Sequence, residues 1–121
     1  MTTDLVEFDD SVYQNLVAEI GEEDTIEVLR TFLDDTSRKF SQLAGRCEDR
    51  MELKREAHSI KSSSATFGFT VLSRLSLELE LGSAAMAPAQ MLEIVTKMHQ
   101  SFDQAALFAE ANLLKGGAAA A

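Results

Sequence analysis

The strongest constraint on the fold is a long run of residues at helical spacing in the first half of the chain. Apolar or small residues recur there every three or four positions, at Ile26, Leu29, Leu33, Thr36, Phe40, Leu43 and Cys47. This spacing predicts an amphipathic α-helix from Asp24, in a capping-box pair with Glu27, to about Arg46. Because an isolated helix is only marginally stable in water, its apolar side must be covered by other helices.

Similar spacing predicts a short first helix and the helix that follows the long one. The first is capped by Asp9 or Asp10 and ends at Gly21. Its inward residues are Val12, Leu16, Val17 and Ile20. The third helix runs from a cap at Asp49 to Gly68, and its inward residues are Leu53, Ala57, Ile60, Ser64 and Phe67.

Two more helices complete the prediction. One starts at Thr70, ends at Gly82 and turns inward Val71, Leu72, Leu75 and Leu79. Leu77 and Leu81 lie off that stripe, so this helix is expected to be buried on more than one side. The last begins near Pro88, the single proline, and buries Met91, Val95, Met98, Phe102, Ala105 and Ala109.

Short connections make successive helices antiparallel neighbours, which predicts an all-α fold: an up-down antiparallel four-helix bundle with a short additional N-terminal helix. We expect a single domain over residues 1–114, and a disordered Gly/Ala tail or an artificial addition over residues 115–121. The core is expected to draw on Leu29, Leu33, Phe40, Leu53, Ile60, Leu72, Leu75 and Phe102.

Charge and composition exclude several classes of function. The net charge of −9 argues against nucleic acid as a partner, because binding to phosphates needs a basic face. One cysteine, Cys47, and two histidines, without HExxH or CxxC spacing, predict no metal site. No apolar run is long enough for a membrane span, and a single cysteine suits a reducing compartment, so we expect a cytoplasmic protein that does not bind membranes. We also expect a monomer. The chain also lacks a glycine-rich phosphate loop for ATP.

His58 is the residue best suited to chemistry. On the third helix it lies about 130° from the apolar stripe, among basic and small residues. An exposed imidazole is partly neutral at physiological pH, so its ring nitrogen is a usable nucleophile. Lys61, one turn further on, can neutralise a phosphoryl group carried by that nitrogen.

Residues 57–68 read AHSIKSSSATFG. They resemble the motif of histidine-containing phosphotransfer (HPt) domains of multistep phosphorelays: His, any residue, an aliphatic, Lys, Gly, two small residues, a spacer and Gly. The matching residues are His58, Ile60, Lys61, Ser63, Ser64 and Gly68. Ser62 stands where the family usually has glycine, and its hydroxyl either hydrogen-bonds the phosphoryl group or slows transfer.

The resemblance implies a phosphocarrier without ATP-dependent kinase activity, in which His58 is phosphorylated and Lys61 and Ser62 stabilise the phosphoryl group. Ser63, Ser64 and Gly68 would then be structural. Implied partners are receiver domains of response regulators and a hybrid sensor kinase, with Mg²⁺ supplied by the receiver and no cofactor in this chain. Expected docking residues are Met51, Lys54, Arg55, Ala65 and, on the first helix, Tyr13.

Two alternatives remain open at this point. The chain could be a helical adaptor that binds a signalling partner without chemistry, or an HPt-like dimerisation module that is phosphorylated by an ATPase domain in trans. Replacing His58 by alanine separates carrier from adaptor, because only the carrier loses its function.

Overall fold

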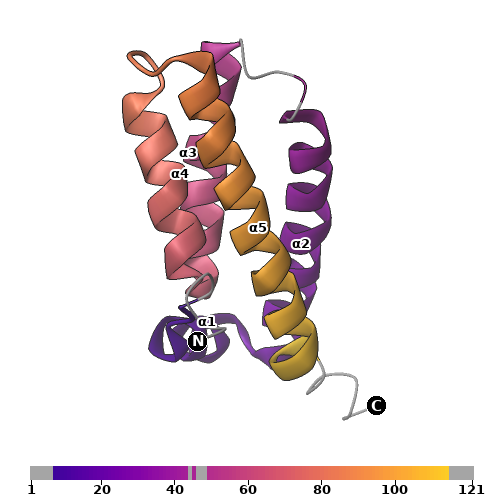
Figure 1. Ribbon diagram of the computed structural model, residues 1–121. Coiled ribbons are helices and arrows are strands. Elements are labelled where there is room, and N and C mark those ends of the chain that lie inside the picture. The colour runs from indigo at the N-terminus through magenta and orange to yellow at the C-terminus, as the bar shows by residue number, and fades with distance from the viewer. Residues whose placement is uncertain (1–6, 44, 46–48, 115–121) are drawn as a thin grey trace.

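The computed structural model describes residues 7–43, 45 and 49–114, and these form four helices side by side with a short helix across one end (Figure 1). The helices are α1 (Asp10–Ile20), α2 (Glu22–Leu43), α3 (Arg50–Phe67), α4 (Thr70–Gly82) and α5 (Pro88–Asn112). From α2 to α5, successive helices run in opposite directions. The predicted all-α up-down bundle is therefore confirmed. The expectations for Arg46, Cys47 and residues 115–121 lie outside the described residues.

The helix ends follow local hydrogen bonding. Asp49 caps α3, because its carboxylate accepts a hydrogen bond from the Glu52 backbone N–H at 3.1 Å. The predicted start of α2 at Asp24 is wrong: Gly21, at φ +92°, turns the chain sharply enough for α2 to begin at Glu22. Asp24 instead lies in an acidic first turn, where negative charge is favourable.

Backbone hydrogen bonds join the N-terminal segment to the turn between α3 and α4. Phe8 and Phe69 form an antiparallel bridge, and the Asp9 N–H donates to the Gly68 carbonyl at 2.7 Å. Gly68 has φ +90°, and a Cβ added there would lie 2.5 Å from the Asp9 carbonyl oxygen. Glycine therefore satisfies both the left-handed cap of α3 and the close approach of the segment that leads into α1.

Because α1 crosses the end of the bundle, it only partly buries its expected apolar side: Val12, Leu16 and Val17 are partly buried, and Leu16 and Val17 pack against the core. Its Ile20, predicted to point inward, is 41% exposed. Tyr13, expected to be an exposed docking residue, is buried, with its ring 5.7 Å from that of Phe8. Burial, followed by the Glu22 carboxylate, raises the pKa of Tyr13. The expectation that Tyr13 is available to a partner is therefore wrong.

Six of the eight predicted core residues are buried, and Leu33 and Leu75 are only partly buried. Leu33 borders an open hollow between α2 and α5, and its neighbour Phe32 is buried instead, 5.2 Å from the Phe67 ring. Leu77 and Leu81 on α4 are exposed, Leu81 by 74%. The prediction that α4 also buries the side with Leu77 and Leu81 is wrong. The helix packs against α3 and α5, and the side that carries these two leucines faces solvent.

Leu29 and Leu33 give a matched test of this packing. Leu29 is fully buried, so Leu29→Ala should lower the free energy of unfolding by about 2–5 kcal/mol, from lost burial and the cavity left behind. Leu33→Ala removes the same atoms from a partly exposed position, so the loss should be clearly smaller. Urea unfolding of both variants measures the difference. Equal losses would contradict the described orientation of α2.

Candidate functional site

The site is built on the side of α3 that faces away from the core. All five residues predicted for the inward stripe of α3 are buried: Leu53, Ala57, Ile60, Ser64 and Phe67. His58 lies off this stripe, and its side chain is 61% exposed. Burial of one face of the helix thus fixes the exposure of the imidazole on the other.

A carboxylate from α4 joins His58 to Lys61. The Oε2 atom of Glu80 lies 2.7 Å from Nδ1 of His58, and its Oε1 atom lies 2.9 Å from Nζ of Lys61. The Glu80 side chain is largely buried between the two helices, at 15% exposed. Nothing local in the sequence distinguishes Glu80 from the other 19 acidic residues, and it lies 22 positions from His58.

The two contacts determine the charge of this carboxylate. The hydrogen bond from Lys61, followed by that from His58, holds the pKa of Glu80 below its ordinary value, although burial opposes this shift. An ionised carboxylate only accepts hydrogen bonds, so Nδ1 of His58 must carry the proton that it donates. In the neutral ring, the lone pair is then on Nε2. Sequence reasoning placed His58 among basic neighbours and missed this acidic contact.

A hollow of about 400 Å³ opens beside the imidazole. It is lined by Met51, Lys54, Arg55, His58 and Glu80. Met51 is 77% exposed, and Lys54 and Arg55 are also exposed, as the docking prediction requires. The hollow therefore presents an apolar side chain and two cations next to the ring.

The small residues after Lys61 differ in their environment. Ser62 and Ala65 are exposed on the helix that carries His58. Ser63 is partly buried on the side toward α2, where it borders another hollow. Ser64 is fully buried, and its hydroxyl donates back to the Ile60 carbonyl. Of the three serines, only Ser62 is on the open side of the helix.

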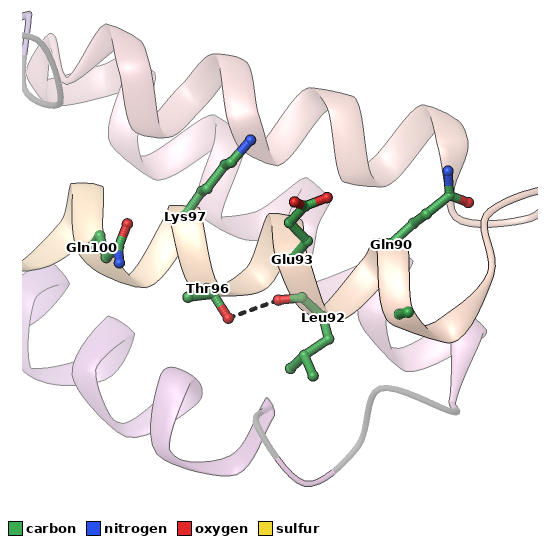
Figure 2. Close-up of a pocket in the computed structure, with 7 residues that line it drawn as sticks. Gln90, Leu92, Glu93, Thr96, Lys97 and Gln100 are labelled. Atoms are coloured by element: carbon green, nitrogen blue, oxygen red, sulfur yellow. Dashed lines mark hydrogen bonds between the residues drawn. The ribbon is translucent and has the colours of Figure 1, made fainter.

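Another hollow, of about 620 Å³, runs along the exposed face of α5 (Figure 2). Figure 2 shows Lys97 and Glu93 on one side of the helix and Leu92 on the other, with the Thr96 hydroxyl donating to the Leu92 carbonyl at 2.8 Å. Its lining contains neither histidine nor cysteine, so His58 and its paired charges belong to the other hollow.

Across residues 7–43, 45 and 49–114, no three His, Cys, Asp or Glu side chains come together in a way that could hold a metal ion. Within the same ranges, every helix is too short or too polar to span a bilayer.

Comparisons with known proteins give one match. The family model described as Hpt domain matches residues 27–100, more than half of the chain. The matched stretch contains His58 and Lys61 and also Glu80. Searches of the curated proteins and of the solved structures return no match.

The lowered pKa of Glu80 gives a prediction for pH. Because the folded value lies below the unfolded one, this carboxylate stabilises the fold above the ordinary glutamate pKa, and the contribution is lost as the pH falls through the lowered value. The Glu80 carboxyl carbon should titrate by NMR below the ordinary glutamate range. Lys61→Met should move its midpoint upward, because the largest cause is removed. An unchanged midpoint would contradict the described contact.

Proposed function

Because the chain belongs to the Hpt domain family, whose members carry out histidine phosphotransfer in phosphorelays, we propose that it is a phosphocarrier with His58 as the phosphorylated residue. In this proposal, His58 takes a phosphoryl group from the phosphoaspartate of one receiver domain and gives it to the aspartate of another. The observation that carries the proposal is the contact between Nδ1 of His58 and Glu80, which leaves Nε2 exposed as the nucleophile.

The proposed step is an in-line displacement at phosphorus. The Nε2 lone pair forms the N–P bond while the bond between phosphorus and the aspartyl oxygen breaks, and the aspartate leaves as a carboxylate. The ring then carries both the phosphoryl group and the Nδ1 proton. Its positive charge is stabilised by Glu80, which already accepts from Nδ1. The reverse step restores the neutral ring.

Lys61 is proposed to neutralise the transferred group. In the unphosphorylated protein its ammonium is held by Glu80 at 2.9 Å. A phosphoryl group on Nε2 brings a second anion to the same place, so Lys61 can bind that anion instead of Glu80, or together with it. The exposed Ser62 hydroxyl is proposed as a further donor. Mg²⁺ and the acidic catalytic residues would come from the receiver.

A phosphohistidine assay tests the carrier function. The chain is incubated with a panel of purified, ³²P-labelled receiver domains, and label on the chain is followed with time. His58→Gln should remain folded by circular dichroism and accept no label, whereas the matched control His99→Gln should accept it as the wild type does. Label on His58→Gln would reject His58 as the acceptor. No transfer from any receiver would favour the adaptor alternative.

Variants of the two charged neighbours test their roles. Lys61→Ala and Glu80→Gln should fold, because neither side chain belongs to the buried hydrophobic core and glutamine keeps the size of Glu80. Each should slow phosphorylation of His58 by about tenfold, since each removes a charge that the proposed transfer step uses. Single-turnover transfer from one labelled receiver measures the effect. Wild-type rates in both variants would show that the two contacts of Glu80 do not act in transfer.

A further inference from the structure

Arg50, the first residue of α3, reaches across to the end of α4. Its Nη1 atom donates to the Ser83 carbonyl at 2.7 Å and to the Met86 carbonyl at 2.5 Å. A cation is unfavourable in the first turn of its own helix, but it is favourable beside the free carbonyls at the end of another helix. Arg50 therefore joins the start of α3 to the end of α4 and to the turn that follows it.

Ser83 belongs to the same helical turn as Glu80. Its N–H donates to the Leu79 carbonyl at 2.9 Å, and its hydroxyl donates to the Glu80 carbonyl at 3.5 Å. Ser83 is only 2% exposed, so the packing around it leaves little room for it to move alone. A shift of Ser83 along α3 therefore carries Glu80 with it.

The contacts of Glu80 depend closely on how α4 is placed along α3. Its carboxylate oxygens lie 2.7 Å from Nδ1 of His58 and 2.9 Å from Nζ of Lys61. A hydrogen bond is lost when this distance reaches about 3.6 Å, whereas one residue of an α-helix rises about 1.5 Å. Because the Glu80 side chain is largely buried between the helices, a slide of α4 by one residue is enough to separate it from the ring.

Hydrogen bonds between the two helices lie on both sides of Glu80. The Ser73 hydroxyl, seven residues before it, donates to the Lys61 carbonyl at 3.2 Å. The Arg50 contact with Ser83 lies three residues after it. The bonds from Arg50 are shorter and charge-assisted, so they constrain the position of α4 more strongly.

From these contacts we propose that Arg50 is a positioning residue of the site: it fixes α4 along α3 and so holds Glu80 against Nδ1 of His58. Arg50 lies eight residues before His58, about 12 Å along the helix, so it acts through α4 and not on the reacting nitrogen. The effect on the protonation of the ring stands on the contacts alone. The effect on phosphoryl transfer rests on the proposed function.

NMR spectra of the ring nitrogens and of the Glu80 carboxyl carbon, recorded on the full chain, test this role. Arg50→Gln removes the guanidinium and its charge, and Arg50→Lys keeps the charge but lacks the guanidinium. As the control, Arg55→Gln removes an equal charge from the lining of the His58 hollow and leaves the contacts of Arg50 in place. Circular dichroism checks that each variant is folded.

In Arg50→Gln, the share of neutral His58 rings that carry the proton on Nδ1 should fall by about half, because Glu80 no longer stays within reach. The titration midpoint of Glu80 should rise toward the ordinary glutamate pKa for the same reason. Arg50→Lys should lie between Arg50→Gln and the wild type, and Arg55→Gln should keep the Nδ1 proton. A residue that only stabilises the fold would leave the ring unchanged. Unchanged values in both folded Arg50 variants, or an equal loss of the Nδ1 proton in Arg55→Gln, would overturn the positioning role.

Phosphoramidate, a small phosphoryl donor that needs no docked partner, measures the consequence for reactivity. Arg50→Gln should slow the reaction of His58 by about fivefold in the wild-type background and have no effect in the Glu80→Ala background, because Arg50 acts through Glu80. An equal loss in both backgrounds would overturn that dependence. Failure of the wild type to exchange with any receiver would overturn the proposed function, while the ring and titration measurements would still decide the role of Arg50.

Discussion

The close packing of α3 against α4 is the contact on which the site depends. The two helices form the most extensive pair in the bundle. Each helix has small residues among its larger buried ones, Ala57 and Ser64 on α3 and Ser76 on α4, and small buried side chains favour a close approach of the backbones. The Gly68 turn between them is held by the N-terminal segment. This geometry alone brings the Glu80 carboxylate within hydrogen-bond distance of His58 and into contact with Lys61.

One carboxylate thereby sets two properties of the site. In the proposed function, its contact with Nδ1 leaves Nε2 as the nucleophile, and its contact with Lys61 keeps the cation near the proposed site of the phosphoryl group. In the proposed carrier, the same carboxylate would also be an anion close to the phosphoryl group and would disfavour a very stable phosphohistidine. A carrier needs this balance, because a group that is bound too tightly is not passed on.

The sequence predicted the helices and the exposure of His58 well, because both depend on the local spacing of apolar residues. It could not predict Glu80, whose role depends on how α4 is aligned along α3, a relation between residues 22 positions apart. It misplaced Tyr13 because helical periodicity does not say that α1 crosses the end of the bundle. The exposure of Leu81 was missed for a related reason: the sequence does not say whether an apolar residue off the stripe is covered by a neighbouring helix or left exposed.

The central claim is that the contact with Glu80 directs phosphorylation to Nε2 of His58. Long-range ¹H–¹⁵N spectra of the two histidine rings, recorded before and after phosphorylation by a receiver, test this directly. The account predicts a proton on Nδ1 of His58 in the unphosphorylated neutral ring, and phosphorus coupling to Nε2 of the same ring after transfer. Phosphorus coupling to Nδ1 of His58, or to a nitrogen of His99, would contradict it.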